Sequence, residues 1–167
     1  MVKDVLLAIF IAFFLTGFVS VAQLTLEEKV GQLLMVHFYG EEANEEAKIL
    51  IKTTHVGGII YYQWCNGLSS PQQVAGLSAG LQKMAAIPLF IAVDQEGGPV
   101  ARLTHGFTAF PSNREVAATG NPNIAEAVAL AMGREMKAVG VNMNLAPVID
   151  VTPERQGSVI SSRSFGG

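Results

Sequence analysis

The sequence lacks most of the features that would assign it directly to a familiar class of protein. It contains a single cysteine, Cys65, so an intrachain disulfide framework is impossible, and we interpret Cys65 as a small, partly buried apolar residue. Charged residues make up only 15% of the chain, the formal net charge is −3 and no basic stripe is present, so nucleic acid is not an expected partner. Half of the residues are hydrophobic, which excludes an intrinsically disordered chain.

Several motifs of catalysis and cofactor binding are also missing. No Gly-x-Gly-x-x-Gly follows the first predicted strand, and the segment GGPVAR lacks the Gly-Lys-Ser/Thr ending of a phosphate loop, so nucleotide binding loses support. The sequence has no His-Glu-x-x-His, no Cys/His cluster at ligand spacing and no Gly-x-Ser-x-Gly. We therefore expect no metal, no cofactor and no serine-hydrolase chemistry.

The N-terminal segment, residues 1–22, has the outline of a secretory signal peptide. Lys3 is followed by an apolar run from Val5 to about Val19, and residues 20–22 form a small-x-small pattern. An acid in the basic region and the length of the run leave an uncleaved membrane anchor as the alternative. The protein is thus expected to be exported, periplasmic or secreted, and to contact a membrane only through this segment if it is not cleaved.

The remainder of the chain alternates between strand and helix signals. Apolar, β-rich runs predict four strands, at 33–40, 56–63, 87–94 and 141–150. Helical periodicity and capping residues predict helices that begin after Thr25 and that lie at 41–55, 70–85 and 121–140. This alternation predicts parallel βαβ units, and the strands are apolar on both faces, as covered parallel strands are.

The predicted fold class is α/β, and a doubly wound sheet and a (β/α)₈ TIM-barrel-type fold both suit the pattern. A complete barrel takes ~250 residues, whereas about 145 residues follow the N-terminal segment. We therefore expect residues 23–167 to form only about the first half of a barrel.

Polar residues lie at the predicted carboxyl ends of the strands, where parallel α/β folds bind ligands. The candidates are Asp94, Glu96, Arg102, Asn142, Asn144, Asp150 and Arg163. Asp94 could instead cap a turn, and Glu96 is expected to support a neighbour rather than to react. Arg102 could be a solvated surface arginine, but its place beside two acids favours an ion pair or a ligand clamp. Gly97-Gly98 predicts a tight turn with positive φ, and the two asparagines are expected to bind loop backbone at the rim.

The three histidines are weaker candidates. His37 lies within a predicted strand and is interpreted as a core histidine with a backbone partner, while His55 precedes a strand and His105 is expected in an exposed loop. A carboxylate with two arginines suits a polar, hydroxyl-rich ligand, because carboxylates accept hydrogen bonds from hydroxyls and guanidinium groups supply paired donors. These residues predict a polar-ligand site without defining a reaction.

Four segments in order, VDQEGGPVARL, FTAFPSN, GREMKAVGVNMNLAPVIDV and RSFGG, resemble family 3 of the glycoside hydrolases. The resemblance runs from about Leu26 to Gly167 and is closest to the β-N-acetylhexosaminidase branch, which typically carries Asp-Gln-Glu-Gly-Gly. It implies a (β/α)₈-type barrel that removes terminal β-linked N-acetylhexosamine from glycans with retention. It also implies that Asp94, Arg102 and Arg163 bind the sugar, so the implied partner is a carbohydrate with a terminal N-acetylglucosamine.

The same resemblance implies that no catalytic residue lies within this chain. In the family a Gly-His-Gly loop with the acid/base histidine and a nucleophilic aspartate on a later strand follow the Arg-Ser-Phe motif, and both are expected beyond Gly167. Pro99 stands where many members have a polar or basic residue. The isolated chain is therefore expected to be inactive, and the alternative function is a non-catalytic, half-barrel sugar-binding or interaction module.

Overall fold

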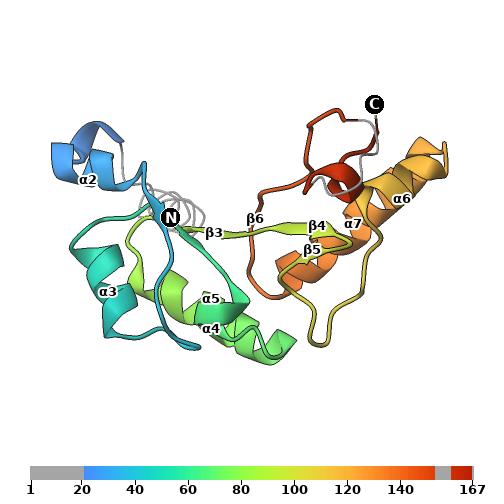
Figure 1. Ribbon diagram of the computed structural model, residues 1–167. Coiled ribbons are helices and arrows are strands. Elements are labelled where there is room, and N and C mark those ends of the chain that lie inside the picture. Colours follow the sequence, from blue (N-terminus) through green and yellow to red (C-terminus); the bar gives the residue numbers. More distant parts are fainter. Residues whose placement is uncertain (1–20, 153–158, 167) are drawn as a thin grey trace, which may run out of the picture.

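The computed structural model describes residues 21–152 and 159–166, whose centre is a parallel sheet (Figure 1). Its strands are β1 (Met35–Val36), β2 (Gly58–Ile60), β3 (Phe90–Val93) and β6 (Met143–Asn144), in the order β1-β2-β3-β6, and every neighbouring pair is parallel. The helices are α2 (Leu26–Gly31), α3 (Glu45–Lys52), α4 (Gln63–Asn66), α5 (Pro71–Met84), α6 (Asn113–Ala118) and α7 (Pro122–Ala138). Short 3₁₀ turns, η1 (Val21–Gln23) and η2 (Ser161–Arg163), complete the order.

The sheet confirms the predicted fold class, since sequential parallel strands joined by helices form part of a TIM-barrel-type domain. The predicted strands are shorter than expected. Only residues 35–36 of 33–40 and 143–144 of 141–150 pair as strands, and the chain after each of them is a loop at the carboxyl edge of the sheet.

Local sequence determines where the helices begin. Thr25 caps α2 through a reciprocal capping box with Glu28, and the Ser70 hydroxyl caps α5, which has Pro71 at its first position. Asn121 caps α7, which is followed by Gly140 with a φ of 78°. All these caps confirm the predicted signals. A second capping box, between Ser112 and Glu115, begins α6, which the sequence did not predict.

The core lies between the sheet and the helices that cover one of its faces. Ile91 and Val93 of β3 are fully buried in one cluster with residues of α3, α5 and α7, whereas Phe90 of the same strand is 58% exposed. Successive side chains of a strand point to opposite faces. One face of the sheet is therefore covered by helices, and the opposite face is exposed at Phe90, although Ala92 on that face is buried; we call this second face the open face.

A β-hairpin that the sequence did not predict follows β3 directly. Its strands are β4 (Gln95–Gly97) and β5 (Val100–Ala101), which are antiparallel. Gly97 and Gly98 form the turn with φ values of 88° and 58°, which confirms the predicted positive-φ pair. The hairpin brings the chain back beside the end of β3, so residue 102 returns to residue 94.

The predicted N-terminal segment lies almost entirely outside the described residues, and its cleavage stays a prediction. Within 21–152 and 159–166, no helix combines the length and apolar character needed to cross a bilayer. Cys65 is buried, as predicted, and His105 lies in an exposed loop, also as predicted.

Candidate functional site

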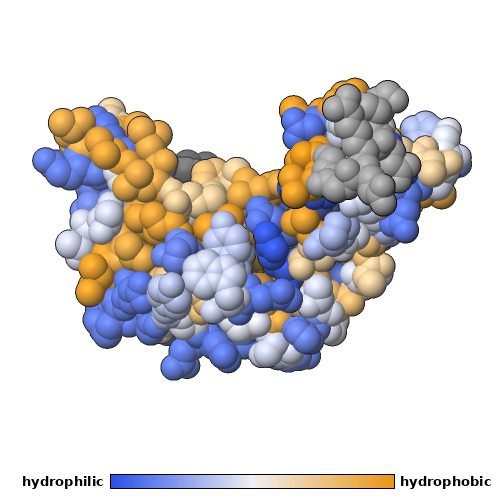
Figure 2. Space-filling model, viewed as in Figure 1, coloured by the Kyte–Doolittle hydropathy of each residue, from blue (hydrophilic) through white to orange (hydrophobic). Residues whose placement is uncertain are grey.

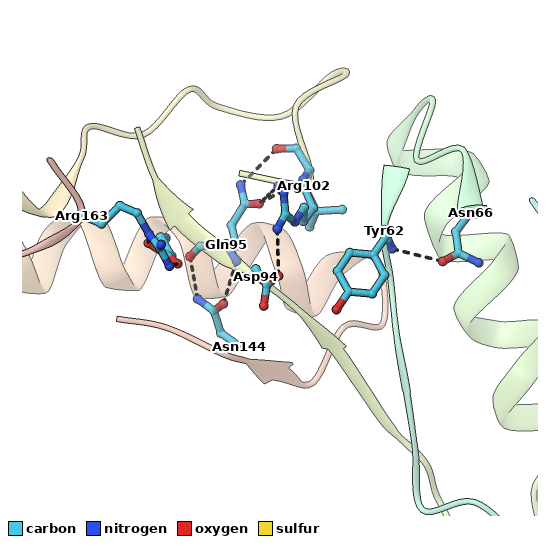
Figure 3. Close-up of polar contacts among 9 residues, drawn as sticks. Tyr62, Asn66, Asp94, Gln95, Arg102, Asn144 and Arg163 are labelled. Atoms are coloured by element: carbon cyan, nitrogen blue, oxygen red, sulfur yellow. Dashed lines mark hydrogen bonds and ion pairs between the residues drawn. The ribbon is translucent and has the colours of Figure 1, made fainter. Parts of the chain in front are cut away.

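An ion pair between Asp94 and Arg102 lies at the carboxyl end of β3. The Arg102 Nη2 atom donates to Asp94 Oδ2 at 3.0 Å, and both side chains are partly exposed, at 32% for Arg102 and 22% for Asp94. Asp94 is held there because it follows the buried strand β3, and Arg102 is held there because the hairpin returns it (Figure 3). Of the possibilities left open for Arg102, the structure thus shows the ion pair, and a ligand-clamping role stays a prediction.

Gln95 fixes the position of Arg102 through the backbone. Its Oε1 atom accepts from the backbone N–H groups of Arg102 at 2.9 Å and of Leu103 at 3.0 Å, and its Nε2 atom donates to the Leu103 carbonyl. Gln95 is only 2% exposed. A buried amide whose donor and acceptor are both engaged is a strong geometric constraint, so the backbone of Arg102 is held beside Asp94.

Two asparagines, Asn144 of β6 and Asn142 just before it, bind the backbone in and around β3. Asn142 accepts from the Ile91 N–H and donates to the Leu89 carbonyl, and Asn144 makes the equivalent pair with the N–H and carbonyl of Gln95. Both were expected to bind loop backbone at the rim. They bind the backbone of β3 and of its flanking residues Leu89 and Gln95, so they hold both ends of this strand in place.

A second ion pair joins Glu96 to Arg163 across 67 positions of sequence. Arg163 donates from Nε to Glu96 Oε2 at 2.9 Å and from Nη2 to Oε1 at 2.7 Å, a bidentate geometry, and the Glu96 side chain is 5% exposed. These hydrogen bonds raise the pKa of Arg163, and the nearby charges of Asp150 and Asp94 raise it further. Glu96 therefore supports a neighbour, as predicted.

Helix α6 holds the turn that carries Arg163. Asn113 donates to the Arg163 carbonyl at 2.7 Å, and Arg114 donates to the carbonyls of Ser161 and Thr152. The capping box of α6 thus has a consequence for the site, because it fixes the helix whose first residues position η2. Ser112 followed three residues later by Glu115 is the sequence signal that would have predicted this helix.

Aromatic side chains from the ends of β1 and β2 adjoin the Asp94–Arg102 pair. The Arg102 guanidinium lies 5.7 Å from the centre of the Tyr62 ring, and Tyr62 stacks on Trp64 at 5.5 Å. His37 is exposed and meets the Trp64 ring edge-on at 5.0 Å. The prediction of a core histidine was wrong, because β1 ends at Val36 and His37 already lies beyond the sheet.

The other predicted positions lie apart from these pairs. Asp150 and His105 are exposed in loops, and His55 precedes β2, at its amino end, with a φ of 56°. Within the described parts of the chain, no group of three or more acidic, histidine or cysteine side chains could hold a metal ion. A cavity of about 340 Å³ lies between Glu96 and α7, but most of the residues that line it are apolar. Its apolar lining suits a hydroxyl-rich ligand less well than Asp94 and Arg102 do.

The fold and the paired charges define a class of protein: a TIM-barrel-type α/β domain with two ion pairs gathered beyond the carboxyl end of β3 (Figures 1 and 3). The family described as the glycosyl hydrolase family 3 N terminal domain matches residues 25–167. The chain belongs to this family.

Relatives of known name and structure agree with this assignment. The β-hexosaminidase of Pseudomonas aeruginosa is 36% identical over 137 residues, covering 80% of this chain and 40% of the relative, and that of Nitrosomonas eutropha is 34% identical over 138 residues, covering 79% and 39%. The structure of a family 3 β-N-acetylglucosaminidase from Paenibacillus sp. str. FPU-7 superposes with a TM-score of 0.80 at 48% identity, covering 86% of this chain and 28% of that chain. The chain thus spans about two fifths of the length of these curated relatives.

Proposed function

We propose that this domain supplies the sugar-binding part of a retaining exo-glycosidase that removes terminal β-linked N-acetylhexosamine from glycans. The observation that carries the proposal is the Asp94–Arg102 pair, held at the carboxyl end of β3 beside Glu96–Arg163 in a chain of this family. The names of the relatives, β-hexosaminidase and β-N-acetylglucosaminidase, support the choice of sugar.

The proposed roles follow from the chemistry of the side chains. The partly exposed Asp94 carboxylate accepts hydrogen bonds from neighbouring hydroxyls of the terminal sugar, while Arg102 and Arg163 donate to its oxygens. Arg163 is held by Glu96, so its planar donors are already oriented before the sugar arrives. Such preorganisation reduces the entropy lost on binding.

Binding and catalysis are proposed to depend on different residues. A retaining glycosidase needs a nucleophile and a proton donor on either side of the scissile bond, about 5–5.5 Å apart when both are carboxylates. Asp94 and Glu96 each form an ion pair with an arginine, and Asp150 is an exposed loop residue. We therefore assign none of these three carboxylates as nucleophile, and we expect the 167-residue chain to bind sugar without hydrolysing it.

Two measurements on the 167-residue chain test this proposal. Calorimetry is expected to show saturable binding of N-acetylglucosamine that Asp94→Ala weakens at least about tenfold, because the hydroxyl acceptor is removed. Glu126→Ala serves as the matched control, since this carboxylate is exposed on α7 and has no assigned role in binding. Unaltered binding by Asp94→Ala would refute the site, and steady release of 4-nitrophenol from a β-N-acetylglucosaminide by the pure chain would refute the separation of binding from catalysis.

Export is proposed on the sequence of the N-terminal segment. Its basic start, apolar run and small-x-small ending are the features that direct secretion. N-terminal sequencing of the protein recovered from a secreting host is expected to find the mature chain beginning at residue 23. Recovery of all the protein in the cytosol with residue 1 or 2 at its start would contradict the proposal.

A further inference from the structure

Four aromatic rings gather beside the proposed sugar site. His37 meets Tyr39, Tyr62 and Trp64 edge-on with ring centres 5.7, 6.1 and 5.0 Å apart, Tyr39 meets Trp64 at 5.6 Å, and Tyr62 stacks on Trp64 at 5.5 Å with 22° between the planes. We call His37, Tyr39, Tyr62 and Trp64 the aromatic cluster.

The aromatic cluster is continuous with the Asp94–Arg102 pair. In the parallel register, Ile60 of β2 lies opposite Ala92 of β3, so Tyr62 and Asp94, each two residues further on, emerge at the same level of the sheet. The Tyr62 ring also lies 5.7 Å from the Arg102 guanidinium carbon. Figure 3 shows Tyr62 on one side of Asp94 and Arg163 on the other.

The backbone beneath the aromatic cluster is rigidly supported. Asn66 is fully buried, and its amide donates to the carbonyls of Phe38 and Gly40 after β1 while its Oδ1 accepts from the Tyr62 N–H after β2. One side chain thus ties together the two segments that carry the rings. Because a buried, fully engaged amide resists rearrangement, the positions of the rings are preorganised.

The rings are nevertheless open to solvent. Trp64 is 62% exposed and Tyr39 is 60% exposed. Figure 2 shows this side of the molecule hollowed in its centre, with hydrophilic residues on the floor of the hollow and apolar residues on both flanks. Exposed aromatic patches that border a polar site are typical of ligand-binding surfaces.

We propose that the aromatic cluster is a second sugar subsite, which binds the ring to which the terminal N-acetylhexosamine is linked. This inference rests on the proposed function, which places the terminal sugar at Asp94. A pyranose ring presents C–H groups on its face and hydroxyls at its edge, so it matches the 62% exposed Trp64 ring beside the rings of Tyr39 and His37, which also carry polar atoms. The substrate class is therefore a glycan whose second residue is itself a sugar.

The sequence provides a direct reporter for this subsite, because Trp64 is its only tryptophan. The β-1,4-linked disaccharide of N-acetylglucosamine is expected to shift the tryptophan emission of the 167-residue chain to shorter wavelength, whereas the monosaccharide, held at Asp94, leaves it unchanged. By calorimetry the disaccharide is expected to bind about tenfold more tightly than the monosaccharide.

Variants of Trp64 test the second subsite independently of the proposed function. Trp64→Ala is expected to lower disaccharide affinity to the monosaccharide value without changing monosaccharide binding, and Trp64→Phe to retain part of the gain. Leu130→Ala, at a 52% exposed position of α7, is the control and leaves both affinities unchanged. Equal affinity of the two sugars for the unaltered chain, or unchanged disaccharide binding in Trp64→Ala, would overturn the subsite alone. Failure of both sugars to bind would overturn the proposed function and the subsite together.

Discussion

At the scale of single residues, the site consists of charges that are paired before any ligand arrives. Asp94 pairs with Arg102, and Glu96 pairs with Arg163. The two pairs differ in burial, since Asp94 is 22% exposed and Glu96 only 5%. Asp94 is therefore exposed enough to contact a ligand, whereas the buried Glu96 is placed to orient Arg163.

Glu96→Gln tests the orienting role. The variant keeps the shape of the side chain but removes the charge that Arg163 faces, so we expect a loss of about 2 kcal/mol in the free energy of unfolding. Affinity for N-acetylglucosamine is expected to fall as well, because Arg163 loses its fixed orientation. Urea unfolding and calorimetry measure the two effects.

An exposed ion pair supplies the control for this variant. Glu45 pairs with Lys48 one helical turn away, and its side chain is 80% exposed. Glu45→Gln is expected to cost less than about 0.5 kcal/mol and to leave sugar binding unchanged. Equal effects of the two substitutions would show that the bidentate geometry at Arg163 has no special importance.

Prediction from sequence was effective for residues whose place depends on strand ends. Asp94 follows an apolar run, so its position at the carboxyl edge could be derived, and the nearby Arg102 was a natural partner. The partner of Glu96 lies 67 positions away, and no local pattern indicates such a contact. Tyr62 and Trp64 were missed because aromatic residues beside a strand usually indicate core. Their place directly after the β2 run was the available signal.

At the scale of elements, the site depends on the β4–β5 hairpin, because this hairpin brings Arg102 back to Asp94. Its sequence, rich in glycine and polar residues, is typical of a loop, and the sequence did not predict strands there. The strand pairing depends on the buried Gln95 and on a turn that only positive φ values allow. The long helices, by contrast, were predictable because their caps and periodicity are local.

Gly97→Ala tests the importance of this turn. Gly97 has a φ of 88°, and a Cβ atom there would overlap the carbonyl oxygen of Pro111. Gly120 also has a positive φ, of 62°, but a Cβ atom there would meet nothing within 4 Å. Comparing alanine substitutions at Gly97 and Gly120 therefore distinguishes the free-energy cost of backbone strain from the cost of steric overlap.

Gly120→Ala is expected to cost about 1–2 kcal/mol in the free energy of unfolding, from the left-handed conformation alone. Gly97→Ala is expected to cost about 1–3 kcal/mol more, because the overlap must be relieved by moving backbone. It should also weaken binding of N-acetylglucosamine, since the hairpin carries Arg102. Chemical denaturation and calorimetry of the two variants provide the comparison, and equal costs would exclude the close approach as a constraint.

At the scale of the whole molecule, one face of the parallel sheet is covered by helices and the other is open. Phe90 in β3 is 58% exposed and Leu145, just after β6, is 40% exposed, whereas Ile91 and Val93 are buried against the helices. In a closed barrel the inner face is filled by layered side chains from all its strands. The four parallel strands described here bring together only part of such a layer.

This asymmetry predicts that the isolated 167-residue chain self-associates through the open face. Exposed apolar sheet surface and unpaired strand edges favour association in water. Phe90→Thr removes the exposed aromatic ring from that face and introduces a β-branched residue that suits a strand, so it is expected to reduce the associated fraction. Sedimentation velocity over a range of concentrations measures the effect.

The control is Leu130→Thr, which removes apolar surface from α7, at a position that is also about half exposed. If association depends on apolar surface in general, the two substitutions reduce it equally. If it depends on the open sheet face, only Phe90→Thr does so, and that is the expected result. A chain that sediments as a monomer at all concentrations would show that the open face does not drive association, even though it exposes Phe90.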